Sequence, residues 1–248
     1  MGAHRKTLRL DPRAGGAAFG DDDREPQIHA DFSRPLAVDT GRMEWQASPA
    51  GGVWRKRLEL IGHDQPRLTS IVRFEPGSRF DEHGHPGGEE ILVLSGTFSD
   101  ASGDFPAGSY VRNPRGWVHA PWTETGCELF VKLCQFQSDD HQRVIVRPSD
   151  LVWQAGDHPD LAVILLHAHG DEQVTLDRLA PGAEGIARDY PEGAEILLLE
   201  GELETDGQRF PLGTWLRLPP GTRQVVGSGP DGCRFYCKRG LLGRTDSE

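Results

Sequence analysis

Hydrophobic and polar residues alternate in short runs along most of the chain, and most runs end at or near a glycine or proline. Clear examples are Leu68–Phe74, Glu90–Ser95, Ser109–Asn113 and Cys127–Phe136. Alternation with a period of two is typical of strands that bury one face. Turn signals that recur at about 8–12 residues are typical of sandwiches and barrels. The pattern therefore predicts an all-β fold without a long amphipathic helix.

The same pattern occurs twice. Pro86–Gly96 reads PGGEEILVLSG, and Pro191–Gly201, 105 positions later, reads PEGAEILLLEG. A run that could be read as helical, Leu161–His169, is interpreted as a strand because its repeat partner, Val53–Ile61, precedes a hairpin turn. Internal repeats of this kind predict two units of the same architecture.

The repeat divides the chain into three parts. We expect an N-terminal extension over 1–42, a first unit over 43–147 and a second unit over 148–248. Residues 11–27 are rich in glycine, aspartate and arginine, so they can bury little surface and we expect them to be mobile. The more apolar stretch Ile28–Val38 is expected to dock on the first unit.

Composition narrows the classes of partner. The formal net charge of -11 makes nucleic acid an unfavourable partner. No apolar stretch approaches the ~20 residues that span a membrane, and the N-terminus does not resemble a secretory signal. We therefore expect a cytoplasmic protein without a membrane segment, in which the four cysteines are reduced thiols.

Residues of metal-binding types gather in the first unit. His83 and His85 are two positions apart, so on a strand their imidazoles point to the same side. Glu89 follows a Pro-Gly-Gly turn that lets the backbone double back toward them, and His119 follows a second Pro-x-Gly turn. Glu90 competes with Glu89 as the carboxylate ligand, because alternation cannot be followed across the turn, and the residues alone leave both open.

Three imidazoles and one carboxylate form a borderline ligand set. Such a set suits zinc, iron, manganese, nickel or copper better than magnesium or calcium. We expect one divalent transition metal ion. Zinc is the first candidate, and iron, manganese and nickel are the alternatives. An octahedral ion would keep positions open for water, oxygen or substrate, whereas four ligands can close a tetrahedron around zinc. The sequence leaves both arrangements open.

The glycines, the proline, the three histidines and the glutamate resemble the two signature motifs of the cupin superfamily. One departure is Thr123, which stands where an asparagine is usual. Longer stretches resemble the ChrR-type cupin domain, the zinc-binding C-terminal half of certain anti-sigma factors: Ala30–Thr40, Met43–Gly62, Gly87–Asp100, Phe105–Pro114 and Gly126–Leu133.

This resemblance implies two tandem cupin jelly-roll barrels, a bicupin, with a metal site at His83, His85, Glu89 and His119. It implies a regulatory, stress-sensing cupin of the anti-sigma-factor type. The alternative is a non-haem metal-dependent dioxygenase acting on a small ketone or aromatic substrate. No cysteine precedes residue 43, so we expect the helical zinc module that grips a sigma factor to be missing. A small-molecule ligand, a protein partner and a homodimer all stay open.

The second unit has lost the ligand residues. At the repeat offset, the four ligand positions hold Arg188, Tyr190, Ala194 and Gln224. We therefore expect no metal there, and a structural role for this unit; an anion pocket at Arg188 is the alternative.

Two further groups of residues carry expectations of their own. A second His-x-His pair, His167 and His169, is interpreted as ordinary strand residues rather than a second metal site. Arg73, Arg112 and Trp117 are expected to pack or lie at the surface, with a pocket-lining role as the alternative.

Overall fold

The computed structural model of the chain describes residues 27–240 and 242. Of the segment 11–27 that we expected to be mobile, residues 11–26 lie outside this described part. The chain forms two compact units. Within the described residues, the first contains 27–30 and 44–151, and the second contains 31–43, 152–240 and 242. We refer to them as the first and the second barrel.

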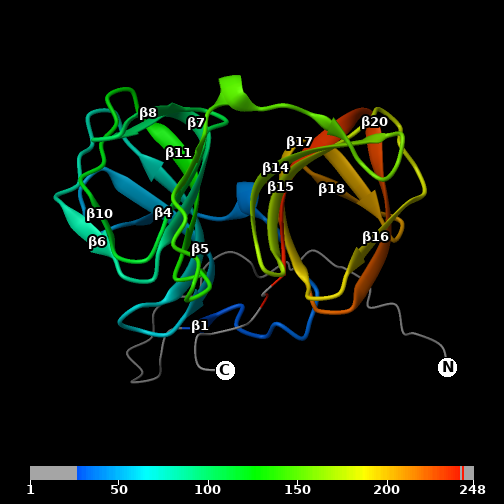
Figure 1. Cartoon of the computed structure of the whole chain (residues 1–248), viewed down its shortest axis with the longest axis horizontal. Coiled ribbons are helices and arrows are strands. Elements are labelled where there is room, and N and C mark those ends of the chain that lie inside the picture. The colour runs from blue at the N-terminus through cyan, green and yellow to red at the C-terminus, as the bar shows by residue number, and fades with distance from the viewer. Residues whose placement is uncertain (1–26, 241, 243–248) are drawn as a thin grey trace. The chain divides into compact units, whose positions relative to one another are not determined.

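The first barrel is built from antiparallel strands (Figure 1). One nine-stranded sheet has the order β1-β4-β5-β11-β7-β9-β12, with β3 paired to β4 and β8 paired to β7, while β6 and β10 form a separate pair. The strands are β1 (Gln27–Ile28), β3 (Gln46–Ala47), β4 (Val53–Ile61), β5 (Arg67–Phe74), β6 (His83–His85), β7 (Glu89–Asp100), β8 (Gly103–Pro106), β9 (Tyr110–Asn113), β10 (Trp117–His119), β11 (Cys127–Leu133) and β12 (Val144–Val146).

The second barrel repeats this order as β13-β14-β15-β20-β17-β19-β2, with β16 paired to β20 and β18 paired to β17. Its strands are β2 (Leu36–Asp39), β13 (Gln154–Ala155), β14 (Leu161–His169), β15 (Glu172–Leu179), β16 (Ile186–Tyr190), β17 (Ala194–Thr205), β18 (Gln208–Pro211), β19 (Thr214–Leu218) and β20 (Thr222–Arg239). The helical segments of the described part are two 3-10 turns, η1 (Thr40–Arg42) and η2 (Pro148–Asp150). The prediction of two all-β jelly-roll barrels is confirmed.

Glycine pairs show why the two repeats share their turns. Gly96 and Gly201 both have a positive φ, +70° and +67°. A Cβ atom at either position would lie 2.0 Å from a carbonyl oxygen, that of Gly126 or Gly232. Only glycine fits where two backbones approach this closely in a left-handed conformation. The same constraint therefore operates at the same place in both barrels.

The first strand of each repeat joins the sheet of the other barrel. Leu36–Asp39 pairs with β19 of the second barrel, and Val144–Val146, 108 positions later, pairs with β9 of the first. The expectation that Ile28–Val38 docks on the first barrel holds for β1, which pairs with β4. It is wrong for β2, because strand propensity marks a segment as a strand without specifying its partner.

The inward face of the first sheet lines a cavity. Leu129, Val131 and Leu133 line a cavity inside the barrel, as the alternation along β11 predicted. On the same strand Phe130 and Lys132 are buried on the opposite face. In the described part of the chain, no helix is long and apolar enough to cross a membrane.

Candidate metal centre

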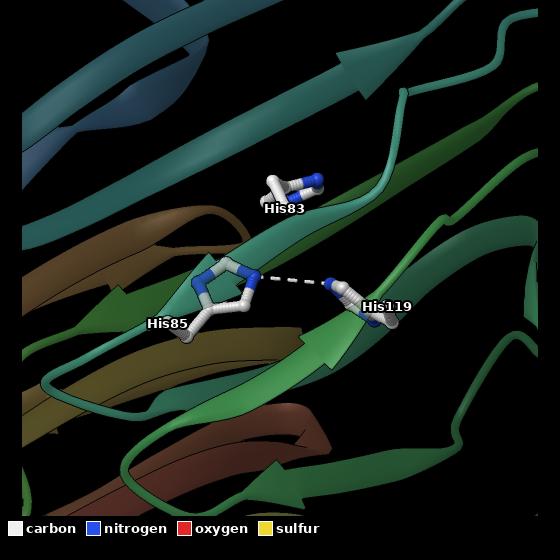
Figure 2. Close-up of side chains that lie close together, drawn as sticks. All are labelled: His83, His85 and His119. Atoms are coloured by element: carbon white, nitrogen blue, oxygen red, sulfur yellow. Dashed lines mark hydrogen bonds between the residues drawn. The ribbon is translucent and has the colours of Figure 1, made fainter.

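The three histidines lie on two paired strands. β6 runs antiparallel to β10, with His83 opposite His119 and His85 opposite Trp117. Because His83 and His85 are two positions apart on β6, both rings project to the side where His119 arrives. Figure 2 shows the three rings turned toward one another. One nitrogen from each of them lies within 4.8 Å of the others.

The distances fit a shared ion. The Nε2 atoms of His85 and His119 are 3.0 Å apart (Figure 2). Two imidazole nitrogens that each bind one ion at about 2.0–2.1 Å lie about 3.0–3.4 Å apart. A carboxylate oxygen of Glu89, Oε2, lies 3.6 Å from Nε2 of His85 and 3.5 Å from Nε2 of His119. Three nitrogens and one oxygen thus converge, a donor set that transition metals favour.

Glu89, and not Glu90, faces the histidines. Asn113 donates a hydrogen bond from Nδ2 to Oε2 of Glu89 at 3.3 Å, which orients the carboxylate. Glu90 points the other way and accepts a hydrogen bond from Arg112 at 2.9 Å. The two neighbouring carboxylates lie on opposite faces of β7, as alternation along a strand requires.

Two of the rings have an oxygen partner at Nδ1, the nitrogen on the far side from Nε2. Nδ1 of His83 is 2.8 Å from the carbonyl oxygen of Asp81, and Nδ1 of His119 is 3.3 Å from a carboxylate oxygen of Asp100. Partners of this kind fix the tautomer, so that Nε2 is left to bind an ion. Burial alone would raise the pKa of Asp100, but hydrogen bonds with His119 and Ser102 lower it below its ordinary value. Asp100 therefore stays ionised beside His119.

His85 is set up as a neutral ligand. Burial lowers the pKa of its imidazole, and the neighbouring His119 and His83 lower it further, against the opposing charge of Glu89. A neutral imidazole is the form that binds metal ions. The environment of His85 thus favours the binding-competent form over a wider pH range than an exposed histidine would have.

A cavity of about 670 Å³ opens beside these ligands. Its lining includes His83, His85 and Glu89, together with a largely apolar wall. Cavities of about 300–1,000 Å³ are typical of small-molecule sites. The arrangement can therefore place a small organic molecule next to an ion held by the histidines.

The second barrel fills the equivalent place with an ion pair. Arg188, at the position of His83, lies opposite Gln224 in the sheet, as His83 lies opposite His119. A nitrogen of Arg188, Nη2, is 2.5 Å from Oδ2 of Asp177. Although burial opposes it, the neighbouring Tyr190 and Asp177 raise the pKa of Arg188. A cationic guanidinium paired to a buried carboxylate cannot substitute for a metal ligand.

The remaining residues singled out in the sequence lie away from the cavity. Arg112 is buried between Glu90 and Asp140, and Arg73 pairs with Glu128. Trp117 stacks under the guanidinium of Arg143 at 4.0 Å. Within the described residues, the histidine cluster of the first barrel is the one group found that could hold a metal, and His167 and His169 are not part of it.

Thr123, at the position where cupins usually carry asparagine, makes a hydrogen bond within the fold. It is buried, and its hydroxyl donates to the carbonyl oxygen of Thr97 at 2.6 Å. The substitution thus leaves the loop after His119 tied to β7.

Sequence reasoning missed three polar residues of the site: Asp100 and Asn113, which contact His119 and Glu89, and Arg55, which lines the cavity. Asp100, Asn113 and Arg55 stand at positions that, at the repeat offsets, hold Thr205, Leu218 and Val163 in the second barrel. These replacements accompany the loss of all four ligand positions. Comparing every polar residue of one repeat with its counterpart, rather than the ligands alone, would have marked all three.

Fold and site together define a two-repeat cupin with one candidate metal centre. The chain belongs to the ChrR Cupin-like domain family, whose pattern matches twice, over residues 33–137 and 141–242. These matches begin ahead of the units that we expected from residues 43 and 148, since each includes the exchanged first strand. The resemblance seen in the sequence is confirmed. No curated protein matches the chain.

Solved structures share the fold at low identity. A candidate dioxygenase from Nostoc punctiforme has a TM-score of 0.71 and 17% identity, covering 87% of this chain and 86% of its own. The bacterial pirin YhhW of Escherichia coli, solved with nickel(II), has a TM-score of 0.62 and 14% identity, covering 83% and 99%. The oxalate decarboxylase of Lactobacillus farciminis, solved with formate, has a TM-score of 0.60 and 11% identity, covering 92% and 89%.

Proposed function

We propose that the first barrel binds one divalent transition metal ion through His83, His85, Glu89 and His119, and that it catalyses an oxygen-dependent conversion of a small organic molecule. The observation that carries this proposal is the cavity of about 670 Å³ that reaches three of these four side chains. A site with a purely structural zinc has no need of such a space, since four protein ligands close its coordination.

The chain's own residues would position the reaction. Asn113 and Asp100 orient Glu89 and His119, and the apolar wall of the cavity would contact the body of the bound molecule. A metal ion held there supplies Lewis acidity or activation of oxygen. The fold likeness to a candidate dioxygenase and to a nickel-bound pirin is compatible with such a site.

Oxygen uptake tests this proposal. The full chain is loaded with Fe(II), Mn(II) or Ni(II) and mixed with a panel of β-diketones and hydroxy-aromatic ketones. We expect uptake with at least one pair of metal and substrate, and its loss in the double variant His83→Ala, His119→Ala. The exposed His63 provides the control His63→Ala, which should keep both metal and uptake. Uptake with no pair, or uptake that persists in the double variant, would overturn the catalytic proposal.

A second candidate is a regulatory, zinc-binding module of the ChrR type, favoured by the family match over both repeats. An oxidant or small ligand that reaches zinc bound by the same four side chains would then change the shape of the barrel and so change its binding to a protein partner. Pull-down with tagged full-length protein should retain a sigma factor or another specific partner, and addition of a zinc chelator should release it. Retention of no partner counts against this candidate.

A further inference from the structure

Two polar side chains point into the first-barrel cavity without a partner. The cavity is lined by Arg55 on β4 and Ser70 on β5. The Nε atom of Arg55 and the hydroxyl of Ser70 are both buried, and neither has a hydrogen-bond partner among the described residues. A buried donor without a partner loses the hydrogen bond that it would make in water. Such groups in a cavity are the expected anchors of a ligand.

The strand register places them close together. Arg55 is opposite Val72 and Arg57 is opposite Ser70, so Arg55 and Ser70 are diagonal neighbours on the inward face of adjacent strands. Diagonal positions of this kind are about 7–8 Å apart at the backbone, within reach of a long arginine side chain. One small anionic group can therefore contact both the guanidinium and the hydroxyl.

Charge selects the kind of group. Burial is the main cause that lowers the pKa of Arg55, and the neighbouring Arg57 adds to it, while the charge of Glu89 acts in the opposite direction. An arginine nevertheless keeps its proton in proteins. When Glu89 holds a divalent ion, its charge no longer offsets that of Arg55. The other acidic side chains of the lining, Asp81 and Glu82, are exposed. A planar carboxylate matches the guanidinium in both charge and shape.

The rest of the wall specifies the body of the ligand. Leu68, Val72, Phe74, Phe98 and Leu129 line the same cavity, so the part beyond the anionic group meets an apolar surface. Arg55 lines the same cavity as His83, His85 and Glu89. A molecule bound at Arg55 would thus present its adjoining atoms toward the candidate metal centre.

The second barrel provides an internal comparison. Val163 occupies the position of Arg55 there, and Thr175, at the position of Ser70, donates to Asp177 at 2.6 Å. Asp177 also receives Arg188. Thr175, Asp177 and Arg188 are therefore hydrogen-bonded to one another in the second barrel. In the first barrel the Nε atom of Arg55 and the hydroxyl of Ser70 have no such partner within the described part of the chain.

We propose that the first-barrel cavity binds a small organic carboxylate with an apolar body, and that Arg55 and Ser70 hold its carboxylate group. This inference rests on the proposed function in treating the bound anion as the substrate. It extends that function by naming the chemical class of the substrate and the two side chains that select it.

Matched probes test the inference without turnover. Zinc-loaded full-length protein is titrated calorimetrically with benzoate, 3-phenylpropanoate and hexanoate, each against its own neutral amide. We expect at least one acid to bind about tenfold or more tightly than its amide, as a charge-assisted hydrogen bond predicts. Arg55→Met should abolish this preference, Arg55→Lys should keep part of it, and Ser70→Ala should weaken binding of the acid severalfold.

The control variant is Arg79→Met, because Arg79 lines the same cavity but is exposed. It should keep the preference for the acid. Thermal unfolding and zinc content of each variant show whether the barrel is intact; if Arg55→Met fails to fold, Arg55→Lys and Ser70→Ala decide the question. Equal binding of acids and amides, binding of neither, or an equal loss in Arg79→Met would overturn the inference.

The same titration separates the two proposals. In the double variant His83→Ala, His119→Ala, a preference for acids that still depends on Arg55 would support the carboxylate site while the metal-dependent reaction fails. Oxygen uptake by the metal-loaded protein that is unchanged in Arg55→Met would support the metal-dependent reaction and contradict the proposal that Arg55 holds its substrate.

Discussion

Replacing Asp100 with asparagine removes one negative charge behind His119 while it keeps the volume of the side chain. The carboxylate oxygen in question lies 3.3 Å from Nδ1 of His119, and Arg143 is 3.9 Å from it. Two full charges at 3.3 Å would interact by about 5 kcal/mol at an effective dielectric constant of about 20, which sets an upper limit. The amide oxygen of asparagine can still accept the hydrogen bond from Nδ1, so only part of this interaction is lost.

The expected effect is therefore on metal affinity. Loss of an outer partner of a ligand typically weakens metal binding about 10–100-fold. Because the acceptor oxygen is retained, we expect the lower end for Asp100→Asn, about tenfold, which corresponds to about 1.4 kcal/mol. Competition between the protein and a chromophoric zinc chelator measures this affinity directly.

A nearby carboxylate provides the matched control. Asp104 is exposed and accepts a hydrogen bond from the hydroxyl of Ser99 at 2.7 Å, and among the described residues no hydrogen bond or ion pair joins it to a candidate ligand histidine. Asp104→Asn should bind zinc as the unmodified protein does. Equal zinc affinity in Asp100→Asn and the unmodified protein, or an equal loss in both variants, would refute the role assigned to Asp100.

Three further predictions concern the fold and the thiols. Ala37→Leu overpacks the core of the second barrel at β2, and should lower the free energy of unfolding by about 1–3 kcal/mol without reducing zinc content. Hydrogen exchange should locate the loss of stability in the second barrel. Gly96→Ala places a side chain at a positive φ and against the carbonyl oxygen of Gly126, so it should lower the free energy of unfolding by at least about 1–3 kcal/mol and release zinc. Thermal unfolding and metal analysis measure these two effects. Iodoacetamide at neutral pH should label Cys134 first, by mass spectrometry, because burial raises the pKa of the other three thiols to about 11 or 12.

The repeat, the strands and the shared direction of His83 and His85 were accessible from the sequence because they depend on local spacing. His119, which lies on a different strand, was assigned to the same site through the resemblance to the cupin motifs. A two-residue step along one strand fixes the side on which His83 and His85 lie. The Glu89 and Glu90 alternatives needed the structure, since the path of the backbone through the preceding turn decides which carboxylate faces inward.

Contacts between distant strands were not accessible in this way. Arg55 reaches the cavity from β4, and Asp100 reaches His119 from the end of β7. Neither belongs to a local motif, and burial of a polar group can be judged only when its surroundings are known. The exchange of β2 and β12 escaped for the same reason, because a short apolar strand fits the edge of either sheet.

This exchange sets an order for folding during synthesis. Asp39 pairs with Thr214, 175 positions later, whereas Arg112 meets Val144 after only 32. The first barrel can thus close soon after Val146 leaves the ribosome, while β2 must wait as an unpaired edge until nearly the whole chain has emerged. A nascent chain stalled between these points would display that edge to its neighbours. Fragments cut between residues 137 and 141 would each carry the strand that the other needs, so co-expression should rescue what neither half achieves alone.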